Sequence, residues 1–168
     1  MRLFIAVKLK PELHDLIRSV QSDFRRQGVR GNYSPAENLH ITLAFIGEYG
    51  DPDTVADAME RVSFAPFTLT MDRIGCFGDL WWTGLSDSPE LQNLVRALRR
   101  TLADAGIPFD KKKFKAHITF LRRAAAYGRI EPPAVQPVSM TVEKISLMRS
   151  DRGKKGMIYT EIASVSAI

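Results

Sequence analysis

The chain contains two short stretches in which apolar and polar residues alternate in the same way, residues 38–45 and residues 115–121. Both contain the tripeptide His-Ile-Thr, and a period of two predicts a strand whose successive side chains point to opposite faces. His40 and Thr42 therefore share one strand face, and His117 and Thr119 share the corresponding face of the second strand. A buried strand seldom carries an imidazole and a hydroxyl on one face, and the chain has only three histidines. Both faces are therefore candidate functional surfaces.

The spacing of apolar residues elsewhere predicts three helices and five further strands. The first helix begins at Pro11 and ends before Gly28, and the third begins after an N-cap at Ser88 and ends before Gly106. A shorter second helix covers about residues 52–62. Alternation predicts strands over residues 3–7, 67–74, 80–85, 138–148 and 157–165, the last two as a hairpin with a basic tip at residues 149–156. Residues 30–37 are expected to be a polar connection, and residues 47–53 and 75–79 are expected to be turns.

These elements repeat along the chain. The first-helix sequence Pro11-Glu12-Leu13 recurs as Pro89-Glu90-Leu91, and the apolar stripe and the terminal glycine of that helix recur at the same offset. His40 recurs at His117, and strand 3–7 maps onto strand 81–85. Two copies predict a pseudo-two-fold molecule rather than a repeat array. We expect residues 1–168 to form one α+β domain of two pseudo-symmetric halves, whose histidine faces converge on one cleft.

Composition narrows the class of protein. An apolar content of 45% over 168 residues is ordinary for a globular domain with a core. The single Cys76 excludes an internal disulfide and favours a reducing compartment such as the cytoplasm. No apolar run is long enough for a signal peptide or a membrane span, so no membrane partner is expected. The net charge of +5 favours an anionic partner such as nucleic acid.

Two imidazoles that face each other suit proton transfer in both directions. An imidazole has a pKa near ~6.5, so one ring can accept a proton while the other donates one at neutral pH. Threonine hydroxyls can donate to an anionic centre, and Arg122 or Arg123, just after the second motif, can supply positive charge. This set suits in-line displacement at phosphorus.

Two other chemistries use the same residues and fit less well. A catalytic zinc needs three protein ligands, and neither motif face offers a cysteine, a carboxylate or a third histidine. A threonine nucleophile needs a base at hydrogen-bond distance and a group that orients this base, whereas side chains two residues apart on a strand point in parallel. We therefore expect no metal and no covalent intermediate.

The paired motifs His40-Ile41-Thr42-Leu43 and His117-Ile118-Thr119-Phe120 resemble those of the two-histidine phosphoesterase superfamily. Within it, residues 2–7, 38–48 and 114–119 are similar to the bacterial and archaeal RNA 2′,3′-cyclic phosphodiesterases, which were first named 2′-5′ RNA ligases. The resemblance covers nearly the whole chain.

This resemblance implies a bilobal α+β fold with antiparallel sheets lining a central cleft. It implies hydrolysis of an RNA 2′,3′-cyclic phosphate end to a 2′-phosphomonoester without a cofactor, and reversible joining of 2′-5′ linkages. Carried over by position, His40 is the proton donor to the departing 3′-oxygen and His117 is the proton acceptor that activates water. Thr42 and Thr119 would hold the non-bridging phosphate oxygens.

The family often has a basic residue shortly after the second motif, and Arg122 fits best. Strand alternation favours Arg123 instead, because it lies six residues after His117 and would share its face. A β-bulge, or the end of the strand at Leu121, would bring Arg122 to the histidine face. We predict Arg122 and keep Arg123 as its rival.

Four further residues are candidate RNA contacts. Phe4 and Trp82 could stack on a base, while Lys115 and Lys154 lie in basic segments that could follow an RNA backbone. Core packing and solvated loops are the competing interpretations.

Other functions remain open from the residues alone. The cleft could bind RNA ends or a nucleotide without turnover, or the same chemistry could act on a small cyclic phosphate or a 2′-5′ oligonucleotide. A pseudo-symmetric single chain is expected to be a monomer without an obligate protein partner.

Overall fold

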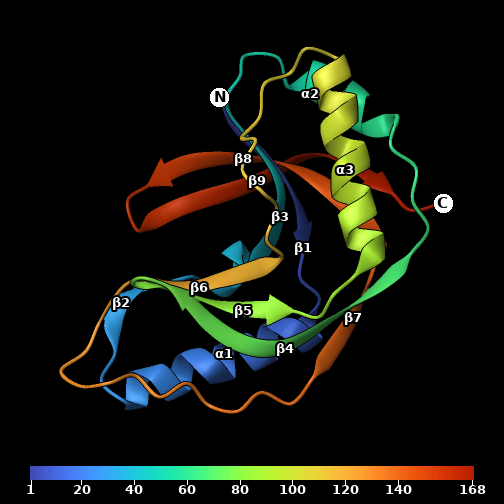
Figure 1. Cartoon of the computed structure of the whole chain (residues 1–168). Helices are drawn as coiled ribbons and strands as arrows, with labels where there is room; N and C mark the ends of the chain where they lie inside the picture. The colour runs from blue at the N-terminus through green and yellow to red at the C-terminus, as the bar shows by residue number, and fades with distance from the viewer.

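The two His-Ile-Thr strands lie in different antiparallel sheets, which face each other in the computed structural model of residues 1–168 (Figure 1). The four-stranded sheet has the order β3 (His40–Glu48), β1 (Arg2–Lys8), β8 (Lys144–Gly153) and β9 (Gly156–Ser166). The five-stranded sheet has the order β2 (Arg30–Tyr33), β6 (His117–Ala125), β5 (Leu80–Leu85), β4 (Phe67–Phe77) and β7 (Val138–Val142). The motif strands β3 and β6 contact each other where the two sheets meet.

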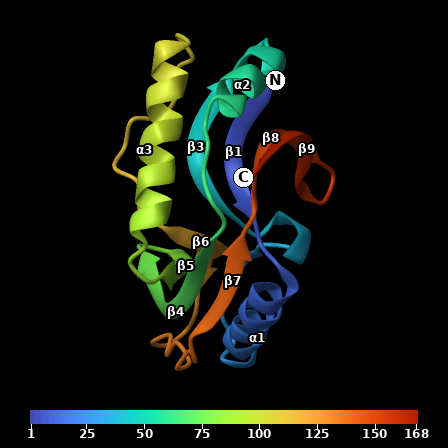
Figure 2. The ribbon, with the colours of Figure 1, turned by 90° about the vertical axis from the view of Figure 1, so that its right-hand side faces the viewer.

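Each long helix packs on the sheet opposite to the one from which it emerges. Helix α1 (Pro11–Arg26) follows β1 of the four-stranded sheet but contacts β6 and β7 of the five-stranded sheet. Helix α3 (Pro89–Asp104) follows β5 but contacts β3 and the short helix α2 (Pro52–Glu60). Figure 2 shows α1 and α3 at opposite ends of the molecule. The two sequence halves are therefore interleaved rather than stacked as separate lobes.

The helix boundaries follow from local chemistry. Pro11, Pro52 and Pro89 each occupy the first turn, where the missing N–H removes no helical hydrogen bond. The Ser88 hydroxyl accepts a hydrogen bond from the Leu91 N–H at 3.2 Å, as its predicted role of N-cap requires. Gly28, just beyond α1, has a φ of 80°, which suits glycine at a helix end.

One contiguous cluster of buried apolar residues joins the two sheets and all three helices. On the five-stranded side, the Phe24 ring of α1 meets Trp81 of β5 at 5.1 Å and Phe120 of β6 at 5.2 Å between ring centroids. Edge-to-face contacts of this kind add to the burial of apolar surface. The predicted α+β fold with two antiparallel sheets, a cleft between them and helices outside is confirmed.

The prediction of a single strand over residues 138–148 is wrong. Strand β7 ends at Val142 and pairs with β4, whereas β8 begins at Lys144 in the other sheet and pairs with β1 and β9. Val142 and Ile145 are both buried although they are three positions apart, an odd spacing that would put them on opposite faces of one strand. This break in the period of two marks the point where the chain crosses between sheets.

Three connections are more ordered than predicted. The hairpin ladder continues through the basic segment, and Arg152 pairs with Met157, so the tip is only Lys154 and Lys155. The polar segment 30–37 contains β2 and a 3₁₀ turn (Ala36–Asn38). Strand β4 also runs through Gly75 to Phe77 before the chain turns. Polar residues form these strands because the neighbouring strands supply their backbone partners.

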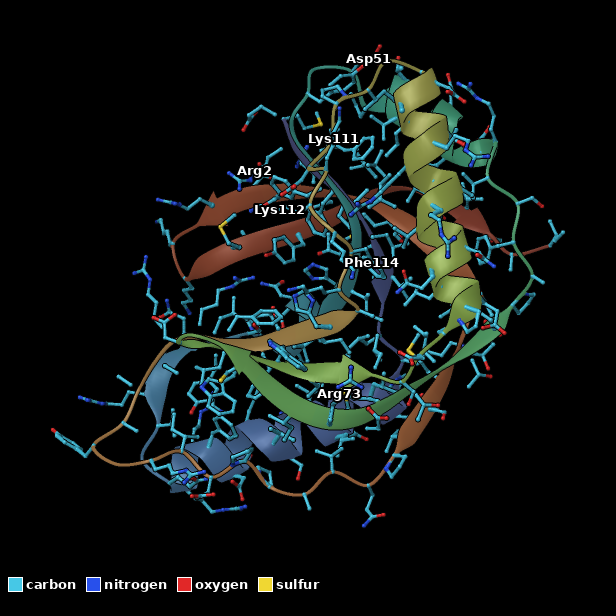
Figure 3. All side chains as sticks on the ribbon, in the orientation of Figure 1. Arg2, Asp51, Arg73, Lys111, Lys112 and Phe114 are labelled. Carbon is cyan, nitrogen blue, oxygen red and sulfur yellow. The ribbon has the colours of Figure 1, made fainter.

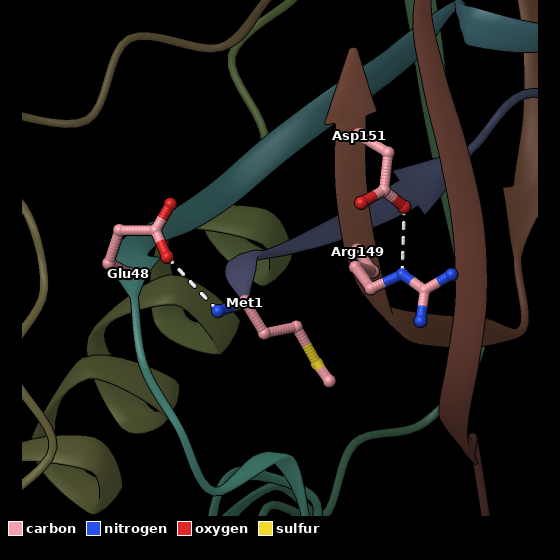
Figure 4. Close-up of polar contacts among 4 residues, drawn as sticks. All are labelled: Met1, Glu48, Arg149 and Asp151. Atoms are coloured by element: carbon pink, nitrogen blue, oxygen red, sulfur yellow. Dashed lines mark hydrogen bonds and ion pairs between the residues drawn. The ribbon is translucent and has the colours of Figure 1, made fainter. Parts of the chain in front are cut away.

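Exposed ion pairs lie along the rim of the four-stranded sheet (Figure 4). The Met1 amino group lies 3.0 Å from the Glu48 carboxylate at the end of β3, and Arg149 Nε lies 2.8 Å from Asp151 on β8. Exposed pairs of this kind contribute little to stability.

Candidate active site

The two motif faces line a single cavity of about 520 Å³ between the sheets. His40 and Thr42 come from β3, and His117 and Thr119 come from β6. The other lining residues belong to β2 and its following turn, the β9 end of the hairpin, and the strands beside them: Asn32, Tyr33, Ser34, Pro35, Asn38, Leu80, Arg122, Lys155, Gly156, Met157 and Tyr159. We call this space the cleft cavity.

Hydrogen bonds fix the ring of His40. Its Nδ1 lies 2.7 Å from the carbonyl oxygen of Asn38, and its Nε2 lies 2.8 Å from the Thr42 hydroxyl. A carbonyl can only accept, so Nδ1 carries a proton and donates it. In the neutral ring, Nε2 therefore has the lone pair and accepts from Thr42, whereas in the charged ring Nε2 donates to Thr42.

The surroundings of His40 favour its neutral form. The Phe4 ring lies 4.9 Å from the imidazole and the Tyr159 ring lies 5.4 Å from it, between centroids. Burial lowers the pKa of His40, the positive charges of Arg122 and His117 lower it further, and the hydrogen bond to the Asn38 carbonyl opposes them in part. The free protein therefore holds His40 neutral at pH 7, and a nearby negative charge would favour its protonation.

His117 is held in the same way from the opposite sheet. Its Nδ1 lies 2.5 Å from the carbonyl oxygen of Lys115, so this ring also donates from Nδ1 and keeps Nε2 for the cleft. Phe77 and Trp82 flank it, with centroids 5.7 and 6.4 Å away. The backbone carbonyl two residues earlier thus orients each histidine.

A β-bulge brings Arg122 to the histidine face. Trp81 pairs with Leu121 and Trp82 pairs with Thr119, so β6 has one residue more than β5 at this point. Phe120 and Leu121 are consecutive and both fully buried, which shifts the alternation by one position. Arg122 consequently lines the cleft cavity with His117 and Thr119. Arg123 does not line it, and has a positive φ of 55° in a second irregularity, opposite β2.

The first motif strand carries the equivalent bulge. Ile5 pairs with Ala44 and Ala6 pairs with Thr42, which leaves Leu43 as the extra residue of β3. The same register places Ala6, rather than Phe4, at the position that corresponds to Trp82. The offset of the sequence repeat is therefore wrong by two residues within β1 and β5.

A buried glutamine supports the bulge of β6 and was missed in the sequence. Gln21 of α1 is 4% exposed, and its Nε2 donates to the carbonyl oxygens of Ser34 at 2.9 Å and Phe120 at 3.1 Å. Ser34 N–H also donates to the Phe120 carbonyl, at 2.9 Å. A polar residue on the buried stripe of an amphipathic helix was the available signal, because a buried amide needs partners.

None of the four candidate RNA contacts lines the cleft cavity, and they lie in different parts of the structure. Phe4 is only 4% exposed and packs against the rings of His40 and Tyr159, so it has no free face for a base. Trp82 and Lys115 lie on the far side of His117 from the cleft cavity. Lys154 does not line the cavity, whereas its neighbour Lys155 does.

The chain contains no group of three or more His, Cys, Asp or Glu side chains that could hold a metal ion. None of its helices combines the length and the apolar character that crossing a bilayer requires.

Known proteins share this architecture and these motifs. Residues 4–154 match the family model of the 2′-5′ RNA ligase superfamily. Two relatives are named RNA 2′,3′-cyclic phosphodiesterase: the protein from Archaeoglobus fulgidus is 32% identical over 96% of this chain and 98% of its own length, and that from Escherichia coli is 31% identical over 96% and 93%. The crystal structure of E. coli LigT without ligand superimposes with a TM-score of 0.84 at 29% identity, covering 99% of this chain and 96% of LigT.

Proposed function

This chain belongs to the 2′-5′ RNA ligase superfamily, and from that premise we propose that it hydrolyses RNA 2′,3′-cyclic phosphate ends to 2′-phosphomonoesters. The observation that carries the proposal is the cleft cavity, where two His-x-Thr faces from different sheets and Arg122 surround one space. The relatives named RNA 2′,3′-cyclic phosphodiesterase support RNA as the substrate.

The reaction needs one proton acceptor and one proton donor on opposite sides of the phosphorus. His117 Nε2 takes a proton from water, whose oxygen forms the new bond to phosphorus. The bond from phosphorus to the 3′-oxygen breaks, and His40 Nε2 gives this oxygen a proton. The 2′-oxygen bond remains, so the product is a 2′-phosphomonoester. Each proton transfer of this kind contributes ~10²–10⁴ to the rate.

The remaining side chains stabilise negative charge. The Thr42 and Thr119 hydroxyls donate to the non-bridging phosphate oxygens, and the Arg122 guanidinium supplies a positive charge and planar donors. These groups already line the cleft cavity in the free protein, and donors placed before the substrate arrives favour the transition state because less reorganisation is required.

The role of His40 as proton donor depends on the bound phosphate. In the free protein the lowered pKa of His40 favours the neutral ring. An anionic phosphate in the cleft cavity would offset the positive charge of Arg122 and raise this pKa. His40 would then take up a proton as the substrate binds.

Turnover of a short RNA with a 2′,3′-cyclic phosphate end tests the proposal. We expect His40→Ala and His117→Ala each to lower kcat by ~10²–10⁴, because each removes one proton transfer. His14→Ala is the matched control, since His14 lies on α1 away from the cleft cavity and should leave kcat unchanged. Tight RNA binding without a 2′-phosphate product in the wild type would instead favour a binding module.

The same assay with excess EDTA tests whether metal takes part. In the proposed mechanism the imidazoles transfer the protons, Arg122 supplies positive charge and the threonines supply hydrogen-bond donors. We therefore expect the same activity with EDTA as without it. Loss of activity that returns on addition of a divalent cation would contradict this mechanism.

Ligation would use the same groups. With a 5′-hydroxyl in place of water, His117 takes the hydroxyl proton as its oxygen bonds to phosphorus, the bond from phosphorus to the 3′-oxygen breaks, and His40 gives this oxygen a proton. The 2′-oxygen bond remains, so the product has a 2′-5′ linkage. A cyclic phosphate on a small nucleotide, or a 2′-5′ oligonucleotide, would fit the same chemistry.

Because one chain supplies both His-x-Thr motifs of the cleft cavity, we propose that the protein acts as a monomer without an obligate protein partner. The single, exposed Cys76 favours a reducing compartment, and we place the protein in the cytoplasm on that ground.

A further inference from the structure

A second cavity of about 290 Å³ lies directly beside the cleft cavity, and His117 lines both. Three aromatic side chains from different segments line this second cavity: Phe77 of β4, Trp82 of β5 and Phe114 of the segment that leads into β6. Figure 3 labels Phe114 on this segment and Arg73 on β4. The volume lies just below the range for small-molecule sites, about 300–1,000 Å³. We call this space the aromatic cavity.

The aromatic cavity continues the surface of the proposed active site. His117 and Thr119 of β6 point into the cleft, and the neighbouring strands carry Trp82 and then Phe77 toward the aromatic cavity. The Trp82 and Phe77 rings lie 5.2 Å apart, and Phe77 is 44% exposed. A ligand could therefore pass from Thr119 over His117 and meet two aromatic rings.

Two glycines fix the position of the indole. A Cβ at Gly75 would lie 2.4 Å from Trp82 Cη2, and one at Gly84 would lie 2.9 Å from Trp82 Cζ3. Real Cβ atoms do not approach that closely, so only glycine at both positions lets the indole lie against the sheet. The position of the Trp82 ring beside His117 therefore depends on glycine at both Gly75 of β4 and Gly84 of β5.

Two cations border these rings. Lys115 Nζ lies 5.3 Å from the centre of the Phe77 ring, within the range of a cation–π contact. Arg73 donates to the Leu85 carbonyl at 3.0 Å and lies 3.0 Å from the Asp72 carboxylate, which keeps the guanidinium at the cavity wall. Ser86, Asp87 and Gln92 add hydrogen-bonding groups at the end near α3. Aromatic faces with adjacent cations are the usual means of binding single-stranded nucleic acid.

We propose that the aromatic cavity binds the nucleotide that precedes the cyclic-phosphate nucleotide in an RNA chain. This inference rests on the proposed function, because it takes the terminal phosphate to lie in the cleft cavity. The base of the preceding nucleotide stacks on Phe77 and Trp82, and Lys115 meets the connecting phosphate. The substrate class is therefore an oligonucleotide of at least two nucleotides rather than a cyclic mononucleotide.

The test compares kcat/KM for a cyclic mononucleotide, adenosine 2′,3′-cyclic phosphate, with that for the dinucleotide ApA ending in the same cyclic phosphate. We expect the wild type to favour the dinucleotide by about tenfold or more, which is within what the stacking of one base can supply. In Phe77→Ala this preference should fall to near one. Because both substrates are measured on the same enzyme preparation, a loss of folded protein cancels in the ratio.

Tyr127→Ala is the matched control, since Tyr127 is 98% exposed and lines neither cavity, so its preference should equal that of the wild type. An equal rate for both substrates in the wild type, or an unchanged preference in Phe77→Ala, would overturn the inference and leave the proposed function intact. Absence of turnover with either substrate would count against the proposed function instead.

A binding measurement keeps the inference testable in that last case. In Trp81→Phe, Trp82 is the single tryptophan, and ApA with a 2′-phosphate should quench its fluorescence as the base stacks. Adenosine 2′-phosphate should produce less quenching at equal saturation. Equal quenching by the two ligands would overturn the assignment of the aromatic cavity.

Discussion

His40 and His117 are oriented by the same local device. In each case the Nδ1–H donates to the carbonyl two residues earlier, that of Asn38 or Lys115. In both rings Nε2 is therefore the nitrogen that can exchange a proton with the substrate. The device needs only the strand backbone, which explains why a tripeptide motif is enough to place the ring. The residues around the two rings differ: Phe4 and Tyr159 flank His40, whereas Phe77 and Trp82 flank His117.

The free protein should hold His40 with a pKa below its ordinary value. Burial and the charges of Arg122 and His117 oppose the imidazolium, so a proton binds only at lower pH. NMR titration of the ring carbons should place the His40 midpoint below ~6.5, and a bound 2′-nucleotide should raise it. A midpoint at or above ~6.5 in the free protein would contradict the burial argument, and Arg122→Gln provides an internal check because it should raise the midpoint.

At this scale the sequence predicted which motif side chains share a strand face, but not their neighbours. His40, Thr42, His117 and Thr119 all line the cleft cavity, as alternation indicated, because a shared strand face depends only on local periodicity. The contacts of Phe4 and Tyr159 with His40 join three strands, and a pattern along one strand carries no information on them.

The matching bulges of β3 and β6 are the decisive feature of the elements. Each inserts one residue after the threonine of the motif and reverses which side chains face the cleft. Arg122 therefore faces the phosphate region, while its counterpart Phe45 packs beside Phe4 and Met148. A strict period of two favoured Arg123, and two consecutive buried residues were the only sequence signal for the bulge.

Gln21→Leu should both destabilise the protein and impair the site. It removes the donor to the Ser34 and Phe120 carbonyls. The Phe120 carbonyl keeps the Ser34 N–H, but the Ser34 carbonyl loses its donor, and an acceptor left without a partner costs about 1–3 kcal/mol. Urea unfolding should report a loss of this size, and KM for a cyclic-phosphate substrate should rise as Arg122 shifts. Gln27→Leu is the control, because its exposed hydrogen bonds at the end of α1 should matter little. Equal effects of the two variants would show that the bulge does not depend on Gln21.

The wrong predictions for β2, β7 and β8 have one cause. Strand β2 is polar and short, and β7 and β8 are separated by a single residue, Glu143. Whether such segments form strands depends on the partner that the fold supplies, here β6, β4 and β1.

The main hydrophobic cluster of the molecule contains buried side chains from both sheets, so we expect the two sheets to unfold together. Leu147 is fully buried on β8 of the four-stranded sheet, while both tryptophans lie on β5 of the five-stranded sheet. Leu147→Ala should cost about 2–5 kcal/mol and lower the unfolding midpoint seen by tryptophan fluorescence. The far-ultraviolet circular dichroism transition should shift equally. A fluorescence transition that stayed at the wild-type midpoint would mean that the sheets unfold separately.

At this largest scale the sequence repeat predicted the pseudo-dyad but not the crossed packing of the helices. The apolar stripe of α1 shows that one helix face is buried, and it does not specify which sheet covers that face. The connections Leu9–Lys10 and Ser86–Ser88 contain no pattern that indicates on which sheet the following helix packs. The choice of sheet depends on contacts in the folded core.

The crossed helices also bear on ancestry. A half-length chain with one strand, one helix and one His-Ile-Thr strand would find no cover for its helix stripe on its own sheet. Two such chains could each lend a helix to the other, as in a domain-swapped homodimer, and their identical histidines would meet across the dyad. Gene duplication and fusion of that dimer would give the crossed arrangement of β1, α1 and β3 with β5, α3 and β6. It would also free the two copies to diverge, so that one retains a cation at position 122 and the other an aromatic ring at position 45.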